Sequence, residues 1–551
     1  MDETTGLGER RARTIVTVVL LAETVWVFLF KYLPLDAGLW SLQAELVRSH
    51  FGGHANDGWR LIGFPASNVL APLIAGIMTA LFSGEVVVRL LLTFVAIFLR
   101  GLGMLALFRV LKVRDLGVYY LIPLLALTGL WFTGALPYLM AECLLLWVLV
   151  FFLSQSYPRS TAYWILSLGF LFISLSSGLA FFLSIFIVIM IMLEQRRNVH
   201  LSQGWFNEPR AVLGLLGLGA ISLLIGIIIG QPVLRLSVTS LLPSPNFGQI
   251  LFFLTPAPNV LEATFRYGHI IHILVAVSFI VVLLGCFARA VLLAIEEVTW
   301  QSRAVRGAGY LLLVLALFGP LFSLIGIESG AGVILAVTLI LAGSYSRGPS
   351  VRRLATDRLI YTISTITVIV SLAINAYSIA AGSAAATDVL NSSRNLVSQE
   401  RERANQDEHL SNIRFRFVMD STLRASAQLV ATLSYSATSP IYLFTEHGIL
   451  DQSSAFQPPG GLVRAKAGSN VPLGISPDIP LLLGSEDKYV DSTVRILAAL
   501  SMGTHSSNAF GPFDMSLMES AGINIDKGEV EYRLAIGKLR AGHPIELAST
   551  K

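Results

Sequence analysis

The residues of this chain best suited to chemistry follow its first apolar run, which covers residues 14–32. Asp36 comes shortly after that run, so we expect its carboxylate at the mouth of a helix bundle. There it can accept a proton from a hydroxyl group or ligate a divalent cation. The position equally suits an N-cap for a helix over 37–49, where apolar residues recur at helical spacing around Trp40.

The same stretch ends in four polar residues that can bind a charged group. His50 and His54 are four residues apart, but two glycines between them disfavour a shared helix face, so a metal site is only weakly indicated. Together with Asp57 and Arg60 they are better suited to a phosphate, because a guanidinium donates two parallel hydrogen bonds to its oxygens.

Arg266 is a candidate of the same kind on a later part of the chain. It opens the run Arg-Tyr-Gly-His at 266–269, next to a long apolar run. In that place an arginine can hold a lipid-linked phosphate or act as an ordinary interfacial anchor, and the residues alone leave both open.

Glu142 is the most isolated charge in the chain. No other Asp, Glu, Lys, Arg or His lies between residues 116 and 158. Charges within a membrane span usually face the bundle interior and mark functional sites, which predicts that Glu142 lines a substrate cavity. The alternative is that Glu142, and likewise Glu23, pairs with Arg89 or Arg100 as packing.

The composition places most of the chain in a lipid environment. Of 551 residues, 54% are hydrophobic and 13% are charged, whereas soluble domains are about one quarter charged. The net charge of +4 comes with arginines in short loops between apolar runs, which indicates membrane orientation and not nucleic-acid binding. The two cysteines, Cys143 and Cys286, both lie in apolar runs, so we expect neither a disulfide framework nor a thiolate metal site.

Eleven apolar runs have the length to cross a bilayer, and a twelfth, 65–82, is ambiguous. Pro65 and Pro72 suit an interfacial or re-entrant helix there. The fold class predicted is therefore an all-α polytopic bundle of about eleven transmembrane helices plus one such helix. The eleven spans cover residues 14–32, 86–108, 116–133, 135–154, 161–176, 178–194, 210–230, 269–292, 309–327, 329–346 and 358–381.

Counting Lys and Arg decides whether 65–82 crosses. If it does not, sixteen basic residues share one side and four, at 48, 60, 235 and 266, the other. If it does, thirteen of the sixteen face outward, against the positive-inside rule. The sixteen are Arg10, Arg11, Arg13, Arg109, Lys112, Arg114, Arg159, Arg196, Arg197, Arg210, Arg303, Arg306, Arg347, Arg352, Arg353 and Arg358.

This count predicts the organisation of the chain. A transmembrane domain covers 1–384, with a cytoplasmic N-terminus, an uncleaved first helix and two large outer loops at 33–84 and 231–268. Residues 385–551 form a smaller α+β domain on the periplasmic or extracellular side, in which an amphipathic helix is expected over 415–433. The location predicted is the cell, or inner, membrane.

This layout resembles the GT-C superfamily of membrane glycosyltransferases, such as the protein O-mannosyltransferases and aminoarabinose transferases. The resemblance lies in an uncleaved first helix, an acidic residue soon after it (Asp36), and a Pro-led interfacial helix from Phe64-Pro65-Ala66 to Phe82. A further match is the run Gly84-Glu-Val-Val-Val-Arg-Leu-Leu at the start of the second span. The chain departs from many members in having Asp36 alone where they have paired acidic residues.

The resemblance implies transfer of a sugar from a polyprenyl-phosphate donor to an outward-facing lipid, glycan or protein acceptor. Asp36 would act as general base, with a divalent cation (Mg or Mn) as its partner. Arg60 and Arg266 would hold the leaving phosphate, and Glu142 would line the cavity. His54 and Asp57 would bind substrate beside Arg60. Two alternatives stay open: an envelope-polysaccharide polymerase, ligase or flippase, and a non-catalytic membrane scaffold with an outer domain.

Overall fold

The computed structural model describes the chain in blocks, and all that follows concerns these residues. They are 3–31, 68–113, 116–154, 160–197, 209–228, 299–323 and 327–346, with shorter pieces between 34 and 61, 234 and 287, and 362 and 380, and four strand segments between 416 and 464.

The first helix, α1 (Glu3–Leu29), has one face toward protein and one toward the surroundings. Val16, Leu20 and Val27 are almost fully buried, whereas Val18 and Leu29 are 59% and 67% exposed. An exposed face made of large apolar side chains is stable in contact with lipid. Residues 8–29 of this helix are also long and apolar enough to cross a membrane.

Three other helices meet the same criterion of length and composition, so the described residues belong to a multi-pass membrane protein. The first is a continuous helix made of α4 (Gly84–Leu90), the π-helical segment η1 (Leu91–Leu99) and α5 (Arg100–Val110). The others are α9 (Leu136–Ser154) and α11 (Gly178–Arg197). Their bounds agree closely with the spans predicted at 86–108, 135–154 and 178–194.

Shorter apolar helices account for further predicted spans. They include α10 (Ser160–Ser176), α12 (Pro209–Ile228), α17 (Val333–Ser344) after the 3-10 turn η6 (Ser329–Gly332), and the helical segment 365–377. The predicted span at 269–292 lies largely outside the described residues, so the total of eleven stays a prediction.

Two predicted spans need correction. Residues 116–133 form three short helices, α6 (Leu116–Tyr119), α7 (Ile122–Ala126) and α8 (Gly129–Thr133), where one helix was predicted. Pro123 starts α7 because it has no N–H to continue a preceding helix. The span predicted at 309–327 begins earlier, as α15 (Trp300–Leu317), and Gly319-Pro320 opens a separate turn, α16 (Gly319–Phe322).

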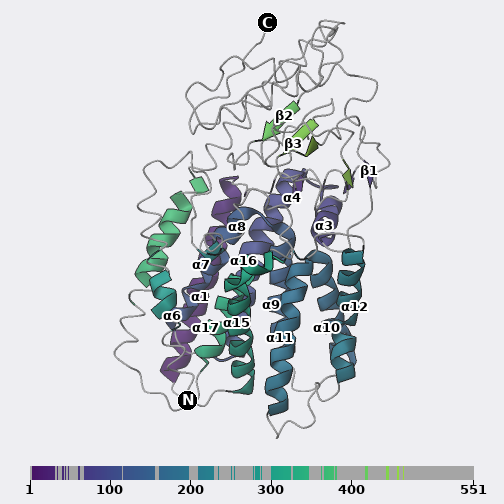
Figure 1. Cartoon of the computed structure of the whole chain (residues 1–551). Helices are drawn as coiled ribbons and strands as arrows, with labels where there is room; N and C mark the ends of the chain where they lie inside the picture. Colours follow the sequence, from purple (N-terminus) through teal and green to yellow (C-terminus); the bar gives the residue numbers. More distant parts are fainter. Residues whose placement is uncertain are drawn as a thin grey trace, which may run out of the picture.

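The helices stand side by side, with the start of α1 at the bottom of the view (Figure 1). Contacts between distant segments define this end. The Tyr119 hydroxyl donates to the Val113 carbonyl at 3.0 Å and lies 3.5 Å from Glu9 Oε1. Val113 forms a β-bridge with Ser346. The loops and helix ends on this side of the bundle contain six described basic residues, so we call this side the Arg-rich end. The six are Arg109, Lys112, Arg196, Arg197, Arg303 and Arg306.

Another set of contacts gathers the loops at the opposite end. The backbone N–H of Val69, just before α3 (Leu70–Met78), donates to the Leu175 carbonyl at 2.9 Å. Glu328 N–H donates to the Leu234 carbonyl at 3.0 Å. The nine residues of α3 span only about 14 Å, too little to cross a bilayer. This is the grouping that the arginine count requires; which membrane face each end occupies stays a prediction.

Short strands lie beyond this opposite end (Figure 1). β2 (Arg416–Met419), β3 (Tyr442–Thr445) and β5 (Val463–Arg464) form a parallel sheet in the order β2-β3-β5. The helix predicted from residue 415 is therefore wrong over β2, where Arg and Phe alternate with a period of two before Val418. The boundary predicted at 384/385 and an outer domain of α+β type stay predictions.

Candidate functional site

The first loop folds back onto the bundle at the opposite end. Of its predicted helix, Ala37, Trp40, Ala44 and Val47 are described as helical and almost fully buried, at a spacing of three to four residues. This spacing puts all four on one helix face. The helix therefore packs against protein along that face. The apolar pattern predicts a helix here, but one that lies in the membrane interface with Trp40 at headgroup depth, and the burial of Trp40 in protein corrects that placement.

Two contacts fix this helix, which we call the loop-one helix and of which residues 37, 40, 41, 44, 47 and 48 are described. The Trp40 indole N–H donates to the Gly134 carbonyl at 2.9 Å, with Trp40 only 1% exposed. A Cβ at position 76 in α3 would lie 2.7 Å from the Val47 Cβ, so Gly76 allows α3 to approach the loop-one helix this closely. The helix is thus clamped between α3 and the α8–α9 turn.

Gly134 supplies its carbonyl through a backbone conformation that favours glycine. Its φ is 73°, the left-handed value common where a helix ends, and it terminates α8 before α9 begins at Leu136. Because the helix is interrupted at this point, the Gly134 carbonyl can accept the hydrogen bond from Trp40. Sequence reasoning passed over this site, although Thr133-Gly134 between two apolar runs was the available signal.

A buried ion pair stabilises the interrupted segment that contains α7 and α8. Arg100 Nη1 lies 3.1 Å from Glu142 Oε2, and the two side chains are 0% and 1% exposed. Arg100 Nη2 also donates to the carbonyls of Leu125 and Ala126 at 2.9 and 2.8 Å. These carbonyls end α7, so the cation sits at the negative end of that helix. Non-helical backbone at membrane depth needs such protein partners.

The π-helical segment supplies the next contact. The Leu92 carbonyl in this segment accepts the Trp131 indole N–H at 2.9 Å. Trp131 is fully buried in α8. The chain of contacts from Glu142 through Arg100 to α7 and α8 therefore reaches Gly134 and the loop-one helix.

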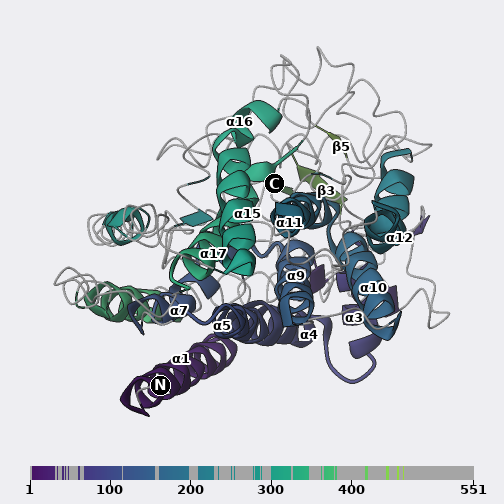
Figure 2. The same ribbon diagram turned by 90° about the horizontal axis from the view of Figure 1, so that it is seen from below.

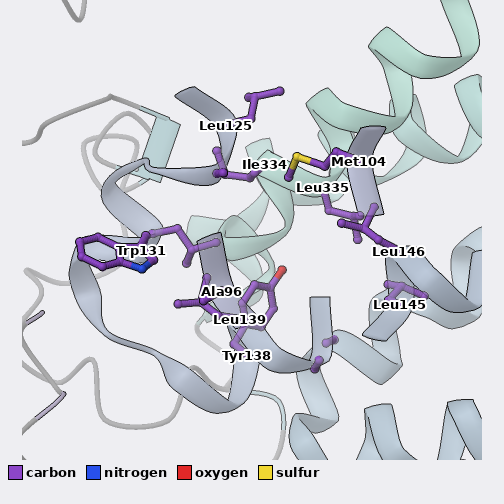
Figure 3. Close-up of a cluster of buried hydrophobic side chains, with 14 of the residues drawn as sticks. Ala96, Met104, Leu125, Trp131, Tyr138, Leu139, Leu145, Leu146, Ile334 and Leu335 are labelled. Carbon is purple, nitrogen blue, oxygen red and sulfur yellow. The ribbon is translucent and has the colours of Figure 1, made fainter. Parts of the chain in front are cut away.

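Tightly packed apolar side chains surround these polar contacts. Figure 3 shows Trp131 and Tyr138 with Ala96, Leu139 and Ile334 from three different parts of the chain. The Tyr138 hydroxyl donates to the Ala331 carbonyl at 3.1 Å and so ties α9 to η6. Seen along the bundle, α5, α9 and α11 lie near the centre and α1 at the edge (Figure 2).

The structure describes only Arg60 and Glu142 among the predicted site residues. Asp36, His54, Asp57 and Arg266 lie outside the described residues. Arg60 belongs to β1 (Arg60–Leu61), which pairs antiparallel with β4 (Phe456–Gln457), Arg60 opposite Gln457. The first loop and the tail therefore meet, and the roles predicted for these residues stay predictions.

Glu142 has the partner that the alternative interpretation gave it, Arg100. The same interpretation is wrong for Glu23, whose two carboxylate oxygens are buried and have no hydrogen-bond partner among the described residues. The second oxygen of Glu142, Oε1, is likewise buried and has no hydrogen-bond partner among these residues. The predicted contact of Glu142 with a substrate therefore stays a prediction, beside a structural role that the geometry shows.

A metal centre is not apparent in the part of the chain that the structure describes. No three His, Cys, Asp or Glu side chains gather there in a way that could hold a metal ion. The cation expected at Asp36 thus rests on that residue alone.

Comparison with known proteins gives distant matches only. No protein-family model matches the sequence, and no curated protein matches it. Among solved structures, the chain is similar to ArnT from Cupriavidus metallidurans, crystallised with undecaprenyl phosphate (TM-score 0.36) and in the apo state (TM-score 0.34). Each match has 14% identity and covers 79% of this chain and 86% of that one. At such TM-scores the likeness does not establish a shared fold.

Proposed function

We propose that this chain is an integral membrane glycosyltransferase. It would move a sugar from a polyprenyl-phosphate donor to a lipid, glycan or protein acceptor at the end of the bundle opposite the Arg-rich end. The observation that carries the proposal is the Trp40–Gly134 hydrogen bond. It holds the loop-one helix on the bundle, so the residue that precedes this helix, Asp36, is attached to an anchored element at the edge of the apolar helices.

Asp36 is the proposed general base. Its carboxylate would take the proton of the acceptor hydroxyl while that oxygen attacks the anomeric carbon of the donor sugar. The bond between this carbon and the phosphate oxygen breaks, and the polyprenyl phosphate leaves with the bonding electrons. Atoms and charge balance without an oxidant, a reductant or a further co-reactant.

The leaving phosphate carries negative charge and needs compensation. Arg60 and Arg266 are the proposed partners, since a guanidinium matches two phosphate oxygens. The pairing of β1 with β4 supports this role because it anchors the backbone of Arg60 against the tail. His54 and Asp57 would contact the donor beside Arg60. A divalent cation at Asp36 would supply further charge compensation, and no step above depends on it.

A transfer assay with the purified full-length chain tests the proposal. Asp36→Asn keeps the shape of the side chain and removes the base, so sugar transfer from a polyprenyl-phosphate donor should fall by about 10²- to 10⁴-fold. Glu45→Gln, the next acidic residue in the loop, is the matched control and should stay within about threefold of wild type, since general-base loss alone produces the larger effect.

The other outcomes point elsewhere. Full activity of Asp36→Asn, with Arg266→Ala strongly impaired, would contradict the base and favour a polymerase, ligase or flippase. If neither substitution matters and only deletion of 385–551 abolishes function in cells, the chain is a scaffold whose outer region works.

A further inference from the structure

The Arg-rich end holds more positive charge than its described partners neutralise. At the ends of α11 and α15, the part of the chain that the structure describes has four arginines and one carboxylate, Glu194. Glu194 is shared between two of them, with Arg197 Nη1 at 3.3 Å and Arg303 Nε at 3.5 Å. The remaining pair is Arg196 and Arg306. Among the described residues, this cluster therefore holds three more arginines than carboxylates.

Arg306 is the member of this cluster that protein packing holds in place. It lies within electrostatic range of Arg303, Glu194 and Tyr310. Its backbone is pinned against α17, because a Cβ added at Gly343 would lie 2.6 Å from the Arg306 nitrogen. The backbone of Arg306 is therefore held against α17, whereas the side chain of Arg197 is 79% exposed.

Arg306 and Tyr310 both keep donors unused. Arg306 Nη1 and the Tyr310 hydroxyl are buried and have no hydrogen-bond partner within the described residues. The two residues are four apart on α15, so their side chains lie on one helix face. Both residues remain partly exposed through their other atoms, so a ligand reaches the two donors once these side chains rotate outward. A buried donor without a partner is costly, and a guanidinium beside a phenol hydroxyl matches the oxygens of a phosphate.

The same helix face becomes apolar deeper in the bundle. Val314 and Leu317 follow Tyr310 at four and seven residues, on the face of Arg306, and are 48% and 44% exposed. The eleven helical steps from Arg306 to Leu317 cover about 16 Å, which is about the thickness of one leaflet of the hydrocarbon core. This arrangement suits a lipid whose charged headgroup lies at Arg306 and Tyr310 and whose acyl chains lie along Val314 and Leu317.

We propose that Arg306 and Tyr310 form a binding site for a phosphate group at the Arg-rich end, and that an anionic phospholipid headgroup occupies it. The lipid chains lie along Val314 and Leu317. This site is at the end of the bundle away from the loop-one helix, so it does not depend on the proposed transfer reaction.

Native mass spectrometry of the detergent-purified full chain tests the site, with phosphatidylglycerol as the probe and phosphatidylcholine as the zwitterionic reference. Arg306→Gln removes a charge-assisted bond and should weaken phosphatidylglycerol binding about tenfold. Tyr310→Phe removes only the hydroxyl and should weaken it about threefold. Arg109→Gln, an exposed arginine at the same end, changes the net charge equally and should leave binding within twofold of wild type, about the effect of general charge screening.

Tyr310→Phe preserves the ring, so it keeps the test valid if Arg306→Gln fails to fold. Equal binding by wild type, Arg306→Gln and Tyr310→Phe overturns the proposal, and so does an equal loss in Arg109→Gln. Inorganic phosphate is added as a competitor in a second arm. Lack of competition at millimolar phosphate supports the lipid; full displacement keeps the phosphate site and overturns its assignment to a lipid.

Discussion

Arg100 and Arg306 belong to the same bundle and differ in what surrounds them. Arg100 is fully buried, and both its terminal nitrogens bond to protein groups, the Glu142 carboxylate and the carbonyls that end α7. Arg306 is partly exposed at the Arg-rich end, and a terminal nitrogen, Nη1, has no partner among the described residues, whereas in Arg100 only Nε lacks one. An interior charge is tolerated when protein satisfies it, whereas a charge at the bundle end can remain available for a ligand.

The largest effect is expected from breaking the interior pair. Arg100→Ala leaves Glu142 and two helix-ending carbonyls buried without a cation, which should cost about 3–5 kcal/mol of folding free energy. Thermal unfolding in detergent, compared with Glu142→Gln, measures it. Glu142→Gln removes the charge but keeps an oxygen for Arg100, so a milder loss is expected. Equal stability of Arg100→Ala and wild type would show that the pair does not hold the broken segment.

Close backbone packing at the Arg-rich end gives the next largest effect. A Cβ at Gly343 would lie 2.6 Å from both the Ser302 carbonyl oxygen and the Arg306 nitrogen, so Gly343→Ala must push α15 and α17 apart. We expect a loss of about 1–3 kcal/mol in unfolding experiments. Gly217→Ala is the matched control, because nothing lies within 4 Å of its Cβ position. Similar melting of the two variants would contradict the α15–α17 contact.

The loop-one contact comes third. Trp40→Phe keeps a buried ring and removes the hydrogen bond to the Gly134 carbonyl, at an expected cost of about 1–3 kcal/mol confined to the loop. Limited proteolysis within the loop should become faster while global unfolding changes little. An unchanged cleavage rate would mean that Trp40 does not anchor this helix.

The smallest effect is expected for the exposed ion pairs. Glu194→Gln breaks contacts to Arg197 and Arg303, which are 79% and 42% exposed. Water and salt screen such pairs, so the loss should stay below about 1 kcal/mol and shrink further at high ionic strength. A loss as large as that of Arg100→Ala would remove the contrast between the interior and the end of the bundle.

Periodicity and charge predicted the parts of this molecule that one physical rule controls. The bounds of α9 and α11 follow from apolar length, the grouping of loop ends follows from arginine counting, and the presence of a helix after the first span follows from helical spacing around Trp40. The burial of Trp40 in protein was not predicted, because spacing alone does not distinguish a protein neighbour from lipid headgroups. Each of these signals is local in sequence or summed over many residues.

The rest depends on partners far away in the chain. The breaks around α7 are stable because Arg100 reaches the carbonyls of Leu125 and Ala126, and an apolar run contains no sign of that contact. β2 depends on its parallel neighbour β3, which comes more than twenty residues later. Roles of Asp36 and Arg266 likewise depend on long-range placement and remain predictions from the sequence.

The central claim is that the loop-one helix and the tail share the end of the bundle opposite the Arg-rich loops. The most direct measurement is labelling of intact cells with a membrane-impermeant maleimide, on a chain whose Cys143 and Cys286 are replaced by alanine. Single cysteines at Gln457 in β4 and at Lys112 beside α5 report the two ends. We predict that Gln457→Cys is labelled from outside and Lys112→Cys only after the membrane is opened. Labelling of Lys112→Cys from outside, or of both positions from the same side, would contradict the account.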